Sequence, residues 1–233
     1  MNLTAAELIA EPLAVAGVVA AVFDRPDLGI AGQLRVHETF RSAGLLAELL
    51  NSLADPNPVV RASAARLCGA LRLSDAVQWV GDLIGDPNPK VREAALRSLG
   101  RLGGSRSVDI LVSWAGRLPL YRVAASLAEA ASDVDIEAVM RKPPSERAAV
   151  ATVMACGLRK DFLRVPSLLG IAHDRRWPQQ VRLAACRALT MISDPAATGA
   201  LRRLADTEPD PMVKAAAERA HKRLVRAAGR SWR

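Results

Sequence analysis

A short motif recurs along the chain, and it constrains the fold more than any other feature. The segments DPNPVVRASAARLCGAL from Asp55 and DPNPKVREAALRSLGRL from Asp86 begin 31 residues apart and share Asp, Pro, Asn, Pro, Val, Arg, Ala and Gly. Asp or Asn before Pro starts a turn, and Pro fits the first turn of a helix because its missing N–H needs no partner there. Each copy therefore predicts a turn followed by a helix.

Further copies of the motif follow. PQQVRLAACRALTMI begins at Pro178, DPMVKAAAERAHKRL begins at Asp210, and weaker copies centre on Arg122 and Arg147. The basic residue of the motif then recurs at separations of 31, 30, 25, 35 and 32 residues. The six positions are Arg61, Arg92, Arg122, Arg147, Arg182 and Lys214. A period of this length is typical of stacked helix pairs.

Apolar residues after the basic position recur at helical spacing. Val91, Ala95, Leu99 and Leu102 follow i, i+4, i+8, i+11, which marks one buried face. Gly69 and Gly100 are expected where a helix crosses its neighbour closely. First helices of the pairs are expected over 45–53, 76–84, 108–118, 162–172 and 196–204. No such pair can bury its apolar stripe alone, so the pairs are predicted to stack into one core.

This pattern resembles the HEAT family, and within it the short repeats named for phycobilisome lyases. The likeness is close over 55–71 and 86–102, good over 178–192 and 209–224, and poor over 119–158. It implies an all-α fold, a right-handed α-α superhelix or solenoid of about six helix-pair repeats.

The resemblance also implies a domain organisation. A single domain is expected over 1–233, with repeats over 45–211 and a basic capping helix over 212–233. Residues 1–44 carry no clear copy and are expected to form a divergent capping pair, over 12–24 and 31–43.

A further implication concerns the recurrent charges. In this family the turn aspartate and the following-helix arginine typically bond along the stack, and a half-buried arginine needs such a partner. The resemblance therefore favours a structural role over a binding role for a ladder of residues. Its members are Asp55, Arg61, Asp86, Arg92, Arg122, Arg147, Arg182 and Lys214.

The net charge of +8 is unevenly placed, with −1 over 1–110 and +9 over 111–233. In the last helix Val213, Ala217, Ala220 and Leu224 mark an apolar face, and basic residues recur on another. The candidate basic patch comprises Arg175, Arg176, Arg219, Lys222, Arg223, Arg226 and Arg230. Three interpretations stay open: a solubilising cap, a site for an acidic protein or anionic membrane surface, and a site for nucleic-acid phosphates.

Residues that carry chemistry form no recognisable motif. Cys68, Cys156 and Cys186 lie in apolar helical runs and are expected to be buried free thiols in a reducing compartment. The histidines at 37, 173 and 221 are far apart and lie in no metal-binding motif, so neither a metal nor a cofactor is expected. HEAT-repeat iron hydroxylases carry several His-Glu pairs, and this chain has only the pair at 37–38.

Two enzymes stay open as alternatives through the resemblance. A DNA glycosylase with HEAT-like repeats needs a carboxylate beside aromatic residues. Trp79, Trp114 and Tyr121 with Asp82 or Asp109 are the candidates, although a core position is favoured for such aromatics. A bilin lyase is the second alternative, although the resemblance is to the repeat alone and no residue pattern in the sequence indicates a tetrapyrrole pocket.

The sequence thus predicts a non-enzymatic scaffold that binds another protein, with an acidic protein among the candidates. A nucleic-acid-binding or DNA-repair protein is one alternative, and a peripheral partner of a membrane complex docked by its basic helix is another. The longest apolar run covers 13–23, and a transmembrane helix needs about 20 residues. A soluble, cytoplasmic protein without a transmembrane segment is therefore expected.

Overall fold

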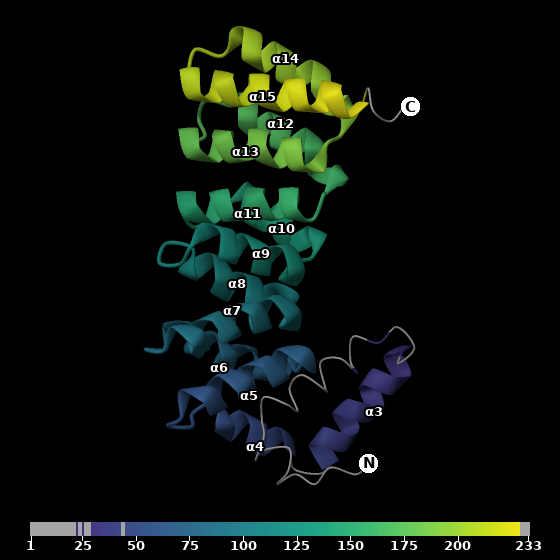
Figure 1. The fold of residues 1–233 in the computed structure, drawn as a ribbon, viewed down its shortest axis with the longest axis vertical. Coiled ribbons are helices and arrows are strands. Elements are labelled where there is room, and N and C mark those ends of the chain that lie inside the picture. Colours follow the sequence, from purple (N-terminus) through teal and green to yellow (C-terminus); the bar gives the residue numbers. More distant parts are fainter. Residues whose placement is uncertain (1–21, 23–24, 26–28, 43–44, 229–233) are drawn as a thin grey trace. The chain divides into compact units, whose positions relative to one another are not determined.

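The structure is a computed structural model that describes residues 22, 25, 29–42 and 45–228 (Figure 1). Within this part of the chain the elements are helices joined by turns, and no strand occurs. The prediction of an all-α fold is confirmed. The helices group into two compact units, Met1–Ile110 and Leu111–Arg233, and the division falls inside the stretch that the sequence predicts as one domain.

The first unit contains five α-helices among its described residues, with short 3-10 turns on either side of the fourth. They are α3 (Gly29–Ser42), α4 (Leu45–Ser52), α5 (Pro58–Ala70), η1 (Ser74–Ala76), α6 (Val77–Asp82), η2 (Leu83–Gly85) and α7 (Pro89–Leu102). α5 and α7 pack side by side, while α4 packs on α5 and α6 packs on α7. The predicted capping helix over 31–43 matches α3, and the one over 12–24 lies outside the described residues apart from Val22.

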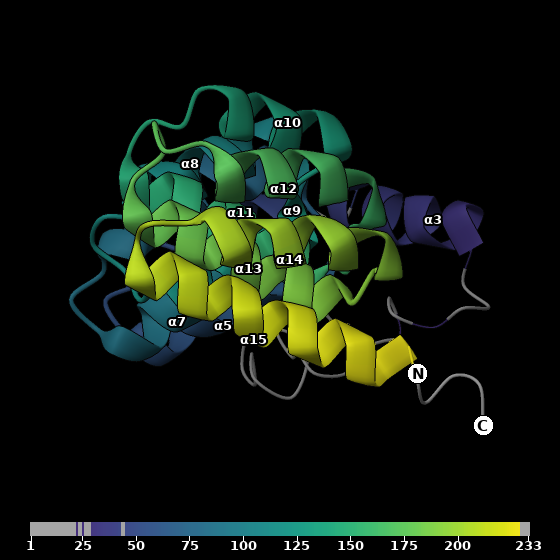
Figure 2. The same ribbon diagram turned by 90° about the horizontal axis from the view of Figure 1, so that it is seen from above.

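In the second unit the described helices alternate between two layers. They are α9 (Leu120–Ala130), α10 (Asp133–Arg141), α11 (Glu146–Leu158), η3 (Phe162–Arg164), α12 (Val165–His173), α13 (Gln179–Ile192), η4 (Pro195–Ala197), α14 (Thr198–Thr207) and α15 (Pro211–Ala228). The second helices α9, α11, α13 and α15 pack side by side in chain order, and α10, α12 and α14 each pack on the helix that follows (Figure 2). α8 (Gly104–Trp114) spans the boundary between the units.

The DPNP turn is explained by its hydrogen bonds. The Asp86 carboxylate accepts the backbone N–H of Asn88 at 2.8 Å, which forms the turn. The Asn88 side chain then accepts the N–H of Lys90 at 2.9 Å and caps α7, with Pro89 as its first residue. Asp55 and Asn57 repeat this arrangement before α5. Each residue of the motif thus satisfies or spares one backbone donor at a helix start.

Small residues allow the second helices to approach closely. A Cβ atom added to Gly69 of α5 would lie 2.8 Å from the Cα atom of Ser98 in α7, which confirms the predicted crossing. Gly157 of α11 meets Ala188 of α13 in the same way, at 2.9 Å. Gly100, for which the same role was expected, is buried in α7. The backbones of adjacent repeats therefore touch within each unit.

The sequence misses one helix, α10. The separation of 25 residues between Arg122 and Arg147 leaves room for only nine helical residues, and no Asp-Pro turn precedes the next helix. Its start is nevertheless encoded, because Ser132 and Asp135 form a reciprocal capping box.

Among the described helices, none is long and apolar enough to cross a membrane.

Candidate functional site

The ladder arginine of the first unit is held by carboxylate and carbonyl oxygens together. The Nε–H and Nη2–H groups of Arg61 donate to the two carboxylate oxygens of Asp86 at 2.8 and 3.0 Å. Its Nη1 donates to the carbonyl oxygens of Asp55 and Pro56. The hydrogen bond from Arg61 lowers the pKa of the Asp86 carboxyl below its usual range. This side chain therefore ties one repeat to the turn of the next.

The other ladder positions differ from this arrangement. Arg92 donates to the carbonyl oxygens of Asp86 and Pro87, both in its own turn. Arg147 donates to the carbonyl oxygens of Ala115 and Leu118, so it reaches back to the preceding turn. Arg122 and Lys214 are exposed. The expected aspartate–arginine bond along the stack thus gives way to carbonyl acceptors, because the turns before α9 and α11 carry no Asp-Pro.

In the last two repeats the pair is buried and uses a glutamate that the sequence analysis missed. The Arg182 guanidinium donates to both carboxylate oxygens of Glu208 and to the carbonyl oxygen of Ala172. The two residues are only 4% and 6% exposed. The signal was present in the segment EPDPMVK, which aligns with DPNPKVR and places Glu208 at the Asp86 position. Asp210 then occupies the Asn88 position and accepts the N–H groups of Met212 and Val213.

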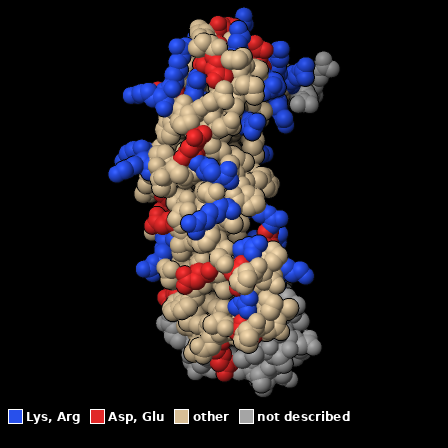
Figure 3. Space-filling view, turned by 90° about the vertical axis from the view of Figure 1, so that its left-hand side faces the viewer, with Lys and Arg blue, Asp and Glu red and all other residues tan. Residues whose placement is uncertain are grey.

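The basic residues of α15 lie on its exposed face. Val213, Ala217, Ala220 and Leu224 are buried on the opposite face, as predicted. The exposed basic side chains, which we call the α15 basic face, form no ion pair with any described residue and accompany a single acid, Glu218. They are Arg219, Lys222, Arg223 and Arg226. On the face that Figure 3 shows, several Lys and Arg side chains project away from any Asp or Glu.

The remaining residues of the predicted patch are Arg175, Arg176 and Arg230. Arg230 lies outside the described residues. Arg176 is bound to Asp174 in the turn before α13, and this bond lowers the pKa of the Asp174 carboxyl. Arg175 lies in the same turn and is exposed. Arg187, which is not a member of the predicted patch, lies eight residues after Gln179, the first residue of α13. It is therefore about 12 Å along the helix axis from the start of α13.

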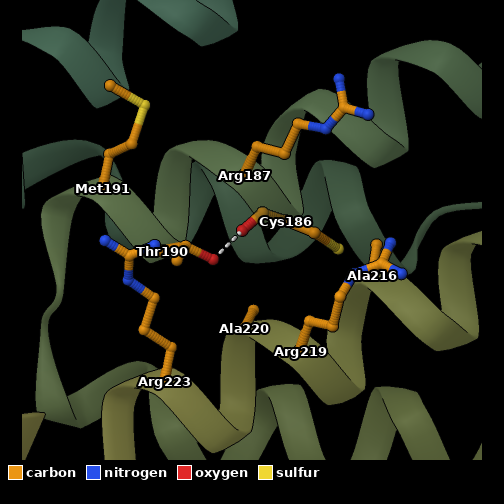
Figure 4. A pocket seen from close by; sticks show the side chains of 8 residues that line it. All are labelled: Cys186, Arg187, Thr190, Met191, Ala216, Arg219, Ala220 and Arg223. Carbon is orange, nitrogen blue, oxygen red and sulfur yellow. Dashed lines mark hydrogen bonds between the residues drawn. The ribbon is translucent and has the colours of Figure 1, made fainter.

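A groove lies between α13 and α15, and we call it the α13–α15 groove (Figure 4). Its volume is about 330 Å³. One wall comes from α13 and the other from α15, and Ala220 lies between Arg219 and Arg223 on the second wall. The lining residues are Cys186, Arg187, Thr190, Met191, Ala216, Arg219, Ala220 and Arg223. Arg219 and Arg223 of the α15 basic face reach toward α13, while Arg187 of α13 lines the same groove with its side chain extending away from α15.

A related hollow of about 420 Å³ lies between α5 and α7 in the first unit. Arg66 and Lys90 supply its positive charge, and Val59 and Ala62 supply apolar surface. Asn88, which also lines it, is already used as the cap of α7. One polar group that lines this hollow is therefore already used in the turn before α7.

Comparison with known families decides the identity of the repeat. Residues 46–132 and 135–222 match the family described as HEAT repeats. The chain belongs to the HEAT-repeat family. No curated protein matches it.

Two solved structures are similar to this HEAT-repeat chain. Human deoxyhypusine hydroxylase in complex with glycerol is 17% identical, with a TM-score of 0.40, and the likeness covers 93% of this chain and 98% of that one. The complex of CpcE and CpcF of phycocyanin lyase from Nostoc sp. PCC7120 is 19% identical, with a TM-score of 0.38, covering 88% of this chain and 86% of that one.

The candidate enzymatic residues of this HEAT-repeat protein are placed differently from expectation. Trp79 and Tyr121 are 49% and 64% exposed, so the favoured core position is wrong for both. Trp114 is half-buried and lies under the Arg117 guanidinium, 5.2 Å from the ring centroid. Asp109 is exposed, and Asp82 accepts a hydrogen bond from Gln78.

The three cysteines of the described repeats are buried. Burial raises the pKa of Cys68 and Cys156 to about 12 and that of Cys186 to about 11, so each remains a thiol at neutral pH. His221 lies 3.1 Å from the carbonyl oxygen of Thr198, and His173 is exposed. Within the described part of the chain, no three His, Cys, Asp or Glu side chains gather as metal ligands.

Proposed function

We propose that this HEAT-repeat protein is a non-enzymatic scaffold that binds an acidic partner protein through the α15 basic face. The observation that carries the proposal is the set of four exposed basic side chains without a described acidic partner. Stacked helix pairs provide large binding surfaces, and the positive charge on α15 would attract an acidic partner to one part of that surface. The three buried free thiols support a place in the reducing cytoplasm.

Contrast with the other helices supports a binding role for this face. Several exposed arginines elsewhere have acidic neighbours one helical turn away, as in Arg97 with Glu93, Arg141 with Glu137 and Arg202 with Asp206. On α15 Lys222 has Glu218 at that spacing, whereas Arg219 and Arg223 are neighbours of the same charge. Such a pair costs about 0.2–0.5 kcal/mol of helix stability. An anionic partner would remove this repulsion on binding.

The test compares a variant of the α15 basic face with a matched control. Arg219, Lys222, Arg223 and Arg226 are replaced by alanine, and the control replaces exposed arginines of α14, Arg202 and Arg203. Wild type and both variants are used to capture partners from an extract of the source cells. We expect one defined acidic protein with wild type and with the control, and its loss with the α15 variant and at high salt.

Two further assays separate the alternative functions. A nucleic-acid-binding protein would retard duplex DNA in a gel, and the retardation would weaken steeply as salt rises. A protein docked on membranes would float with anionic liposomes and not with neutral ones. We expect neither behaviour at physiological salt. Retardation or flotation that the α15 variant abolishes, without capture of an acidic protein, would contradict the proposal.

A further inference from the structure

The construction of the α13–α15 groove gives it two chemically different parts. Helical spacing places Arg187 and Met191 of α13 one turn apart, and it does the same for Arg219 and Arg223 of α15. The α15 wall between and beside its two arginines consists of Ala216 and Ala220, which are too small to fill the space. Cationic side chains therefore border a shallow apolar hollow (Figure 4).

The groove cations are free to bind a ligand. Arg187, Arg219 and Arg223 form no ion pair with any residue that the structure describes, and all three are exposed. A guanidinium binds a carboxylate through two parallel hydrogen bonds, which adds geometric specificity to the charge attraction. In the same groove the Thr190 hydroxyl donates to the Cys186 carbonyl at 2.8 Å, so its oxygen still accepts a hydrogen bond from a ligand N–H.

The apolar part distinguishes between classes of ligand. Met191 lines the groove from α13 and is 42% exposed, with its sulfur directed at Gly157 of α11, and a thioether adapts its shape to the apolar group that it covers. A phosphate backbone has no apolar group for this surface, and no aromatic side chain lines the groove to stack on a base. A protein segment carries both carboxylates and aliphatic side chains. The groove chemistry thus favours a peptide over a nucleic acid.

We propose that the α13–α15 groove binds a short acidic segment of the partner protein, with carboxylates on Arg187, Arg219 and Arg223 and an aliphatic side chain against Met191 and the alanines. This inference rests on the proposed function and adds the position and chemistry of the contact. The volume of the groove, about 330 Å³, lies at the small end of ligand pockets, so it suits the aliphatic side chain, while the carboxylates would bind the arginines at its border.

The experiment measures binding of a labelled peptide by fluorescence anisotropy. The probe is a peptide of about eight residues, in which leucines alternate with pairs of glutamates, so that it carries both the carboxylates and the aliphatic groups of the proposed segment. Two control peptides replace the glutamates by glutamine or the leucines by serine. Both controls are expected to bind at least about tenfold more weakly than the probe.

Variants of α13 test the groove separately from the α15 basic face. We expect Arg187→Ala to weaken binding of the probe about tenfold and Met191→Gln about fivefold. The matched controls are Arg203→Ala, an exposed arginine on α14, and Met212→Gln, an exposed methionine of α15 outside the groove. Both controls are expected to change the affinity less than about twofold.

Each unfavourable outcome has a distinct meaning. No saturable binding of the probe at low salt, or equal effects of the α13 variants and their controls, would overturn the groove while leaving partner capture through α15 intact. Tighter binding of short duplex DNA, with the same dependence on Arg187, would assign the groove to nucleic acid and also overturn the inference. Partner capture that survives loss of the α15 basic face would instead contradict the proposed function.

Discussion

Burial of a guanidinium with a carboxylate removes both charges from water, so the contact must supply hydrogen bonds in return. Arg182 and Glu208 meet this condition, because the arginine donates to both carboxylate oxygens and to the Ala172 carbonyl. Burial alone would raise the pKa of the Glu208 carboxyl, but the hydrogen bonds from Arg182 and from the Asp210 N–H outweigh it and lower the pKa. The sequence predicted the arginine and not its partner, since Asp210 was aligned with the turn aspartate in place of Glu208.

The first prediction concerns this buried pair. Arg182→Met leaves the Glu208 carboxylate buried without a cation and should lower the free energy of unfolding by about 3 kcal/mol. The double variant Arg182→Met with Glu208→Leu removes both charges and should recover most of that loss. Urea unfolding followed by circular dichroism measures both. Equal destabilisation of the single and double variants would show that the charge of Glu208 is not the cause.

The second prediction uses the pair of Arg61 and Asp86. Arg61 lowers the folded-state pKa of Asp86 below the unfolded value of about 3.9, so the pair contributes stability above that pH. This contribution is lost as the pH falls through the folded-state pKa. We expect the free energy of unfolding of wild type to decrease below about pH 4, and Asp86→Asn to flatten this decrease. Urea titrations between neutral and acidic pH measure the slopes, and identical slopes would contradict the assignment.

At the scale of elements, the success of prediction follows the strength of local signals. The helices after Asp55 and Asp86 start at the second proline of DPNP because Asp and Asn accept backbone N–H groups there and this proline has no N–H that needs a partner. α10 was missed because its start depends on Ser132 and Asp135 alone, and the period of the repeat shortens around it. The groove between α13 and α15 could not be predicted either, since it depends on how two helices pack.

The third prediction contrasts two helical glycines. Gly69→Ala would place a Cβ atom 2.8 Å from the backbone of Ser98, so α5 and α7 must separate and the protein should lose about 1–3 kcal/mol of stability. Gly170→Ala on α12 meets nothing within 4 Å and should gain about 0.5–1 kcal/mol from the higher helix propensity of alanine. Thermal and urea unfolding measure both. A gain at Gly69 would show that the two helices tolerate a wider spacing.

At the scale of the whole molecule, the change in net charge along the chain coincides with the division into two compact units. Residues 1–110 carry a net charge of −1 and residues 111–233 carry +9, and the division of the chain into two compact units falls after Ile110. The second unit therefore supplies the positive field that would attract an acidic partner and raise its association rate at low salt. The sequence showed this asymmetry in full because charge needs no knowledge of packing.

The last prediction concerns how far a local change spreads. Within each unit a second helix packs on its neighbours in chain order, so stability is a sum of local terms and nearest-neighbour contacts. Hydrogen exchange followed by mass spectrometry should therefore show faster exchange in α13, α14 and α15 for Arg182→Met, with α5 and α7 unchanged. Gly69→Ala should show the reverse pattern. Faster exchange throughout both units for either variant would mean that the chain opens as one cooperative body, because nearest-neighbour coupling alone cannot carry a local defect to every helix.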